Sequence, residues 1–329
     1  MSSTSEDLES LVKQEAQKAE RILAEIKRVI VGQATVSKRL LMAMVAGGHV
    51  LLEGLPGLAK TTSIKCLGQA TALSFKRIQF TPDLLPADLI GTQIYDPRNA
   101  EFKVRKGPIF ANLILADEIN RAPAKVQSAL LEAMEEKQVT IGDQTWPLEE
   151  PFLVMATQNP IEHEGTYPLP EAQIDRFLFK LKMTYTSAED ELEIIKRAGT
   201  RQDIKLEKVA TRYEILSLRD TVEKIYVSEK IRHYIVSIVY TTRTPKERGF
   251  AELAPLIEYG ASPRASLNLD RAARVNALFE GRSFVTPQDV KDVCVDILRH
   301  RVKPTYEAEA ENMSSEMIIA KILERVDVP

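Results

Sequence analysis

The sequence is poor in the residue types that build disulfides and zinc sites. It has 2 cysteines and 4 histidines in 329 residues, without a CxxC pair or a metal-ligand spacing of histidines. We therefore expect Cys66 and Cys294 to be buried thiols of a protein in a reducing compartment. His163 precedes Glu164, but no second histidine follows four residues after the first, so we expect a loop residue there and not a zinc ligand.

Long apolar runs and a strong excess of one charge are also lacking. No run approaches the roughly 18 apolar residues of a membrane span, and the polar, acidic start from Met1 to Asp7 is unlike a signal peptide. The formal net charge of -3 argues against a surface built mainly for nucleic acid. We therefore expect a cytoplasmic protein without a membrane span, and we do not expect a nucleic-acid partner.

The pattern of apolar residues divides the chain into two parts. Strand and helix patterns alternate up to about residue 185, and helical patterns alone follow. We expect an α/β core at 1–185, in which helices flank a parallel sheet, and an all-helical lid domain at 186–329. The core would carry a helix at its N-terminus and inserted β-hairpins near 92–104 and 139–148. Trp146, Phe102 and Tyr95 fall in these hairpins and are expected to pack there, or alternatively to face a pore or a partner.

A glycine-bearing loop between a strand and a helix is the first chemical signal. The apolar run His49–Leu52 precedes Gly54-Leu55-Pro56-Gly57-Leu58-Ala59-Lys60-Thr61-Thr62, and a helical pattern follows. Loop N–H groups and a helix N-terminus suit phosphate, Lys60 brings a positive charge, and the Thr61 hydroxyl can reach Mg²⁺. Ala59 stands at the second glycine of the general G-x-x-x-x-G-K-[ST] pattern. On this loop alone, a simple turn with a solvated lysine is the alternative.

Two carboxylates follow the strongest strand signal in the chain. The apolar run Phe110–Ala116 ends in Asp117 and Glu118, and the carboxyl ends of buried parallel strands are where open α/β sheets bind ligands. Asp117 is predicted to hold Mg²⁺, mostly through water, and Glu118 to orient and polarise an attacking water. The alternative, a solvated acidic turn, is disfavoured because the pair ends an apolar run.

Three further polar residues are candidates for contacts with phosphate or water. Asn159 ends the next buried strand, and its amide could position the water or contact the γ-phosphate. Arg176 precedes the last strand and is predicted to reach a neighbouring subunit's phosphates as an arginine finger; the alternative is an ion pair with Asp175 or Glu171. Arg264, in the first turn of a lid helix, is a second candidate phosphate contact, against a surface arginine.

The order of these motifs along the chain resembles that of the AAA+ ATPases, and the residues within each motif resemble those of the MoxR family. The resemblance covers about Val31 to Arg301 and is highly specific. Ala59 matches that family's usual loop, while His163 stands where the family commonly has glutamine. The motifs that carry the resemblance are Gly54–Thr61, Gly107–Phe110, Asp117–Ala122, Leu130–Glu136, and Gln158–Pro160 through Asp175–Phe177.

The resemblance implies a role for each candidate residue. In MoxR proteins the blocks are the Walker A loop, the Walker B strand, sensor 1, the arginine finger and sensor 2. Carried over to this chain, the Walker blocks imply Mg²⁺ binding by Thr61 and Asp117 and water activation by Glu118. They also imply sensor 1 at Asn159, an arginine finger at Arg176 that acts in trans, and sensor 2 at Arg264, which acts in cis or in trans. The residues implied to bind ATP or ADP are Gly54, Leu55, Pro56, Gly57, Leu58, Ala59, Lys60, Thr61 and Thr62, with Val31 and Gly32 near the adenine.

The resemblance also implies an assembly and a task. MoxR proteins are thought to form hexameric rings that remodel a client protein in maturation or cofactor insertion, often with a von Willebrand factor A domain partner. The hairpins resemble the helix-2 and pre-sensor-1 inserts of a clade shared with magnesium chelatase subunits and replicative helicases. A nucleic-acid-stimulated motor is therefore one alternative. A non-hydrolysing nucleotide-gated scaffold is another, against which the intact Asp117–Glu118 pair argues.

Overall fold

The computed structural model describes residues 2–54, 60–158, 166–199 and 204–329 of the chain. Its contacts define two compact units. The α/β unit comprises Arg21–Phe177 and Leu181–Leu216, and the helical unit comprises Met1–Glu20, Leu178–Lys180 and Ser217–Pro329. Within the described residues, no helix is long and apolar enough to cross a membrane.

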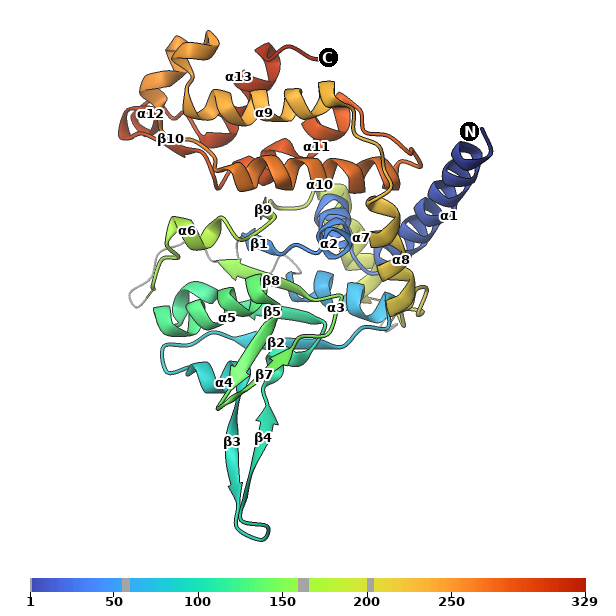
Figure 1. Ribbon diagram of the computed structural model, residues 1–329, viewed down its shortest axis with the longest axis vertical. Helices are drawn as coiled ribbons and strands as arrows, with labels where there is room; N and C mark the ends of the chain where they lie inside the picture. Colours follow the sequence, from blue (N-terminus) through green and yellow to red (C-terminus); the bar gives the residue numbers. More distant parts are fainter. Residues whose placement is uncertain (1, 55–59, 159–165, 200–203) are drawn as a thin grey trace. The chain divides into compact units, whose positions relative to one another are not determined.

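A five-stranded sheet forms the centre of the α/β unit, with the strand order β2-β5-β8-β1-β9 (Figure 1). Its strands are β1 (Val50–Glu53), β2 (Phe75–Gln79), β5 (Leu113–Asp117), β8 (Leu153–Gln158) and β9 (Phe179–Lys182). The pairs β2–β5, β5–β8 and β8–β1 are parallel. Leu113 to Ala116 are fully buried, which confirms the prediction of a central parallel strand from this apolar run.

Helices cover both faces of this sheet. Successive residues of a strand point to opposite faces, and Ile114 and Ala116 of β5 belong to one core with α5 (Ala124–Glu136). Leu113 points the other way, towards α3 (Lys60–Ala70), where a Cβ on Gly68 would lie 3.2 Å from Leu113 Cδ1. In Figure 1, α2 (Ala34–Ala46) and α3 lie on one side of the strands and α5 on the other.

The remaining helices of this part of the chain include one that the sequence did not predict. Pro86 occupies the first turn of α4 (Pro86–Ile90), where the missing proline N–H costs nothing, so the proline begins a helix and does not break one. The others are α1 (Ser2–Lys27), α6 (Glu171–Ile174), α7 (Ala188–Gly199), α8 (Arg212–Val222), and the 3-10 turns η1 (Pro108–Phe110) and η2 (Ile119–Arg121).

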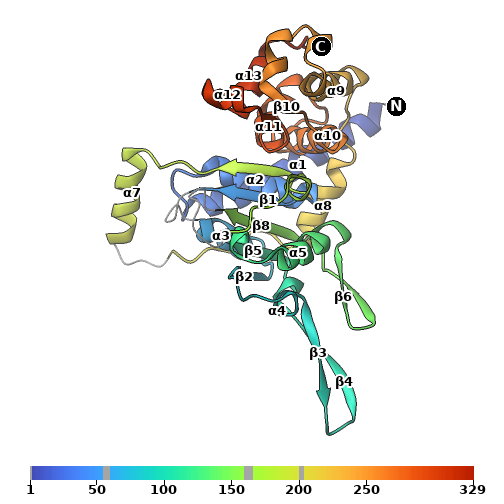
Figure 2. The ribbon, with the colours of Figure 1, turned by 90° about the vertical axis from the view of Figure 1, so that its left-hand side faces the viewer.

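Two antiparallel hairpins are added to the α/β unit. They are β3 (Gly91–Asp96) with β4 (Glu101–Lys106), and β6 (Gln138–Ile141) with β7 (Gln144–Pro147). The β3–β4 hairpin projects from its unit in both ribbon views (Figures 1 and 2). Among the described residues no second layer covers this ribbon, so Tyr95 and Phe102 pack on each other at 5.3 Å between ring centroids yet remain 52% and 67% exposed. Trp146 is half-buried, with Lys106 Nζ 4.5 Å from its ring centroid.

The helical unit is a bundle whose helices begin at side-chain caps. Ser262 Oγ accepts from the backbone of Arg264, and Thr286 forms a reciprocal capping box with Asp289. The Ser-Pro and Thr-Pro pairs of the sequence predict both starts. The elements are α9 (Glu229–Arg243), η3 (Lys246–Arg248), η4 (Ala251–Leu256), β10 (Ile257–Tyr259), α10 (Pro263–Phe279), α11 (Pro287–Leu298), β11 (Lys303–Pro304), α12 (Tyr306–Ala310) and α13 (Ser315–Arg325).

Both cysteines are buried free thiols, as predicted. Burial raises the pKa of Cys66 to about 11 and also raises the pKa of Cys294. Because the thiolate is the reactive form, neither side chain is suited to nucleophilic or redox chemistry.

A buried histidine joins three elements of the α/β unit. Val154 of β8 donates its N–H to His49 Nδ1 (3.0 Å), so the ring proton lies on Nε2, which donates to Met134 O of α5 (3.2 Å). Burial lowers the pKa of His49 from 6.5 to about 4, against the hydrogen bond to Met134, and Lys137 lowers it further. The folded protein therefore holds this imidazole neutral.

This histidine predicts a loss of stability in mild acid. His49 binds a proton below about pH 6.5 in the unfolded chain but only near pH 4 in the folded chain. Its contribution to the unfolding free energy is therefore complete above about pH 6.5 and is lost as the pH falls towards 4. Between about pH 7.5 and 5.0 the contribution is on the order of 2 kcal/mol. Urea denaturation at both pH values should show that His49→Gln loses this part of the pH dependence, while His233→Gln, at an exposed position of α9, keeps it. Equal pH dependence in all three proteins would contradict the prediction.

Candidate functional site

Several predicted ligand residues meet at the carboxyl edge of the sheet. β1 ends at Glu53, one residue before Gly54, and β5 ends at Asp117. The parallel register pairs Glu53 with Gln158 and Gln79 with Asp117. β1, β2, β5 and β8 therefore end together, at the edge where sheets of this kind bind ligands.

Lys60 lies in the electrostatic field of both predicted carboxylates. It is the first residue of α3, and its Nζ donates to Gly54 O. Burial lowers the pKa of Lys60, while the charges of Asp117 and Glu118 raise it in opposition. The amine and the two carboxylates thus interact electrostatically at the same edge of the sheet.

Thr61 and Thr62 follow Lys60 in the first turn of α3. The other loop residues that the sequence singles out, Leu55, Pro56, Gly57, Leu58 and Ala59, lie outside the described residues, as do Asn159 and His163. Their predicted roles stay predictions.

Asp117 is held by two neighbouring strands. Thr157 Oγ1, from β8, donates to Asp117 Oδ1 at 2.7 Å. Arg77, from β2, donates to Asp117 Oδ2 through Nε at 3.0 Å and a terminal nitrogen at 2.6 Å. The carboxylate is only 16% exposed, so its direction is fixed from both sides of β5.

Glu118 begins a tight turn directly after the strand. Its backbone is left-handed, with φ 57° and ψ 51°, and its N–H donates to Thr157 Oγ1 at 2.9 Å. Gln79 Nε2 at 3.1 Å and Arg121 at 2.9 Å both donate to Glu118 Oε2. A left-handed residue other than glycine costs about 1–2 kcal/mol, so this turn is maintained by the surrounding hydrogen bonds.

The segment at Val31 and Gly32 lies against the chain that follows β9. Gly32 has φ +74°, and a Cβ there would lie 2.6 Å from Thr186 and 2.8 Å from Asp190. Gln33 Nε2 donates to Thr184 O at 3.2 Å. Only glycine fits this close approach, which gives the predicted adenine-side segment a fixed place in the α/β unit.

Arg176 follows α6 and lines a cavity of about 500 Å³ together with Gln173 and with Glu132 and Glu136 of α5. Among the described residues, its guanidinium has no ion pair within 4.0 Å. The alternative of an intrachain pair with Asp175 or Glu171 is therefore not what the structure contains.

Arg264 is the second residue of α10, after Pro263. Its N–H donates to Ser262 Oγ at 3.2 Å, which places it in the first turn, as predicted. It belongs to the helical unit, whereas Lys60, Asp117 and Glu118 belong to the α/β unit.

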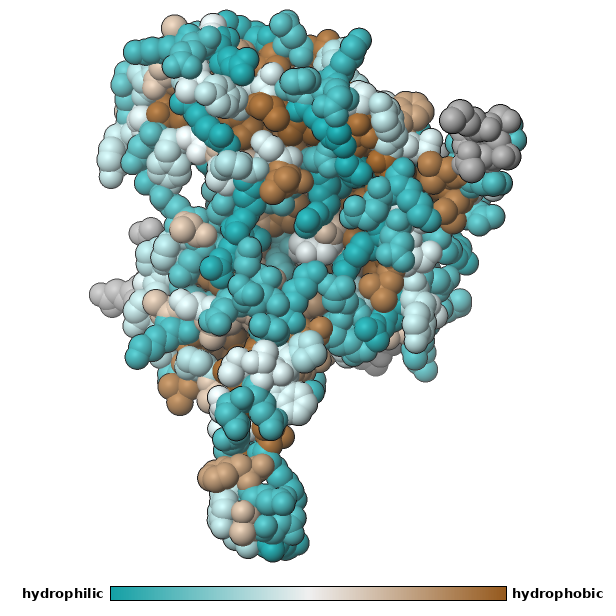
Figure 3. All heavy atoms as spheres, viewed as in Figure 1, coloured by the Kyte–Doolittle hydropathy of each residue, from teal (hydrophilic) through white to brown (hydrophobic). Residues whose placement is uncertain are grey.

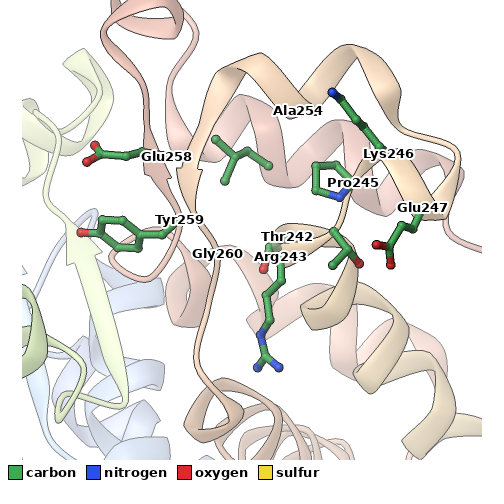
Figure 4. Close-up of a pocket in the computed structure, with 11 residues that line it drawn as sticks. Thr242, Arg243, Pro245, Lys246, Glu247, Ala254, Glu258, Tyr259 and Gly260 are labelled. Carbon is green, nitrogen blue, oxygen red and sulfur yellow. The ribbon is translucent and has the colours of Figure 1, made fainter.

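A separate cavity of about 300 Å³ lies in the helical unit, between the end of α9 and β10 (Figure 4). Two of its charged residues have structural partners: Arg243 bonds to Ala261 O, and Glu258 pairs with Lys303 at 3.4 Å. None of the described residues that are predicted to bind or cleave nucleotide lines this cavity, so it is separate from the described part of the predicted site.

Four residues that orient the two carboxylates were not predicted from the sequence. Arg77 and Gln79 come from β2, Thr157 from β8 and Arg121 from the turn η2. Arg121 lies three positions after Glu118 and could have been found from spacing. The other three depend on the strand order β2-β5-β8, which the sequence does not reveal.

The donors at this edge fit the Mg²⁺ that the resemblance implies. Asp117 and Thr61 supply a carboxylate and a hydroxyl oxygen, the hard ligands that Mg²⁺ prefers alongside water and phosphate. Within the described residues there is no cluster of three or more histidine, cysteine, aspartate or glutamate side chains that could hold a metal ion. A site completed by nucleotide phosphate and water agrees with this set better than a metal cage made by protein alone.

Comparisons with known proteins agree with the motifs. Residues 49–179 match the ATPase family associated with various cellular activities (AAA), and residues 251–322 match the AAA lid domain. Over 310 residues the chain is 49% identical to Chaperone MoxR1 of Mycobacterium tuberculosis, covering 94% of this chain and 82% of that protein. It is 44% identical to the protein YeaC of Bacillus subtilis, covering 94% of both. The crystal structure of a candidate ATPase from Cytophaga hutchinsonii has a TM-score of 0.93 at 50% identity, covering 98% of both chains.

Proposed function

Because the chain belongs to the MoxR family of AAA+ ATPases, we propose that it hydrolyses ATP to ADP and phosphate with Mg²⁺ as a ring of identical subunits. The observation that carries the proposal is the pair Asp117–Glu118, fixed beside Lys60 at the carboxyl edge of the sheet. Family membership indicates that the chain binds a nucleotide, and the two oriented carboxylates are the groups that we propose act in its cleavage.

The nucleotide binds between the loop and the turn of Val31 and Gly32 in this proposal. Loop N–H groups from Gly54 to Ala59 and the Lys60 amine hold the phosphates. Thr61 and Asp117 would hold Mg²⁺, which would supply positive charge against the negative charge that develops on the phosphates. Arg77 donates to Asp117 Oδ2, so the carboxylate keeps its direction.

Glu118 orients the attacking water. Gln79 and Arg121 both donate to Oε2, which leaves Oε1 as the oxygen that accepts a hydrogen bond from the water. The carboxylate thereby polarises the O–H bond and directs the oxygen lone pair at the γ-phosphate. In this proposal Asn159, the residue that follows β8 in the sequence, contacts the same water or the γ-phosphate.

Arg176 acts on the nucleotide of a neighbouring subunit. Its guanidinium has no ion pair among the described residues and borders an open cavity, which supports an arginine that awaits a phosphate from outside its own chain. Each site then needs a residue from a second subunit, so hydrolysis would depend on assembly of the ring. A hexamer is the size that the family resemblance implies. Arg264 completes the site as sensor 2, in cis or in trans.

The client of this ATPase is a protein, and we propose a von Willebrand factor A domain protein as its class. The β3–β4 hairpin supports a remodelling role because Tyr95 and Phe102 are exposed on it, and Figure 3 shows brown and pale-brown side chains on the hairpin among hydrophilic ones. Exposed aromatic side chains on a projecting ribbon are suited to protein contacts. The cytoplasm stays the proposed location.

Replacing Glu118 separates binding from hydrolysis. Glu118→Gln keeps the size of the side chain but removes the charge that polarises water, so turnover should fall by at least about 100-fold while ATP affinity is retained. Steady-state phosphate release and equilibrium binding of labelled ATP measure the two effects. Glu324→Gln makes the same change on the exposed face of α13 and should leave both unchanged. Normal turnover in Glu118→Gln would remove the assigned role.

The arginine finger is tested by mixing two inactive proteins. Arg176→Ala should lose about 1,000-fold in turnover or more with ATP affinity kept, because the lost cation acts on transition-state charge. Lys60→Ala offers an intact Arg176 beside a site that cannot hold phosphate. Mixed subunits should regain part of the activity, since the wild-type arginine of one chain then faces the wild-type lysine of its neighbour. If no mixing ratio restores phosphate release, action in trans is refuted.

A further inference from the structure

A buried amide lies behind the turn that carries Glu118. Gln127 of α5 is fully buried. Its Nε2 lies 3.2 Å from Ile119 O, 3.1 Å from Ala122 O and 3.0 Å from Tyr167 O. All three partners are carbonyl oxygens, which can only accept, so the amide nitrogen must point at them.

A second contact joins the same two segments. Tyr167 N–H donates to Asn120 O at 2.6 Å. Asn120 lies between the two turn residues whose carbonyls Gln127 holds. The turn from Glu118 to Ala122 and the segment at Tyr167 are therefore tied to each other directly and again through Gln127.

The arrangement has a cost that packing alone does not explain. Gln127 Oε1 and Asn120 Oδ1 are buried without a hydrogen-bond partner among the described residues. An unpaired buried acceptor is unfavourable, because it has given up its hydrogen bonds to water without replacing them. An apolar residue at position 127 would avoid half of that cost, but it would release three carbonyls of the turn and the Tyr167 segment.

Each tied segment leads directly to a residue of the proposed reaction. Glu118 immediately precedes the turn η2. On the other side, Leu169 belongs to the hydrophobic core, α6 follows, and Arg176 stands two residues after α6 ends. A displacement of either segment relative to Gln127 would be passed to the other.

We propose that Gln127 is a positioning residue that holds the Glu118 turn and the Tyr167–Arg176 segment as one piece. The inference rests on the proposed ATPase function. Through this tie, the placement of Glu118 in one site and of Arg176 towards the next site change together. Gln127 itself touches neither nucleotide nor water.

The position of Gln127 in the sequence carries a signal for this role. It shares the inward face of α5 with Leu130, Leu131 and Met134, at helical spacings of three, four and seven. A polar residue on an apolar helix face must find buried partners, and here the partners are backbone carbonyls of two loops.

The test compares two buried side-chain amides whose nitrogen atoms both donate to backbone carbonyls. Gln127→Met keeps the volume and removes the N–H donors. The matched control is Asn112→Leu. Asn112 is also buried, and its Nδ2 donates to Glu149 O and Pro151 O. Asn112 itself immediately precedes β5, at the opposite end of that strand from Glu118. Gln127→Asn, which keeps an amide one methylene shorter, provides a milder variant if Gln127→Met does not fold.

Two measurements are made on the full-length variants. Turnover with ATP should fall by about 10- to 100-fold in Gln127→Met, with little change in KM, because a small misplacement of a catalytic group has this effect. Gln127→Asn should show a smaller fall in the same direction. Asn112→Leu should keep wild-type turnover at a temperature where all variants are folded.

Backbone hydrogen exchange measures whether Gln127 stabilises both segments, independently of ATPase activity. Peptides covering Glu118–Ala122 and Thr166–Phe177 should both exchange about 10-fold faster in the Gln127 variant that folds, and keep wild-type rates in Asn112→Leu. Faster exchange in one peptide alone, or wild-type exchange in both, would overturn the proposal, as would a fall in turnover no larger than in Asn112→Leu. A wild-type protein that binds ATP without cleaving it would contradict the proposed function, yet paired exchange would still support the tie.

Discussion

The hydroxyl of Thr157 is the contact on which the geometry of the site depends. It accepts the N–H of Glu118 and donates to Oδ1 of Asp117, so one side chain of β8 fixes the backbone of one carboxylate residue and the side chain of the other. Thr157 is buried, and a hydrogen bond removed from water is stronger and more costly to lose. The left-handed backbone of Glu118 persists because this bond and the bonds of Gln127 hold both ends of the turn.

The charges around this contact balance one another. Two adjacent carboxylates would repel at close range, but Arg77 bonds to Asp117, Arg121 bonds to Glu118, and Lys60 lies in the field of both. Each carboxylate is therefore oriented by neighbouring side chains of the protein itself. Because these groups are already in position, they need to move little during phosphate cleavage, which lowers the free-energy barrier.

Much of the fold was predictable because local chemistry determines it. The apolar run before Asp117 predicted a buried parallel strand, and Ser262 and Thr286 predicted helix starts. Contacts across the sheet were not predictable: Arg77 and Thr157 each stand 40 positions from Asp117, and only the strand order brings them together. Tyr95 and Phe102 were expected to pack in their hairpin. They contact each other, but the hairpin projects from its unit, so both rings remain largely exposed.

The central claim is that the oriented pair Asp117–Glu118 makes this chain a magnesium-dependent ATPase. The most direct test is phosphate release from ATP by the purified wild-type protein, measured with Mg²⁺ and again after the ion is removed by a chelator. We expect multiple turnovers with Mg²⁺ and loss of turnover without it, restored when Mg²⁺ is added back. ATP that binds in the presence of Mg²⁺ and is recovered uncleaved, or cleavage unaffected by the chelator, would contradict it.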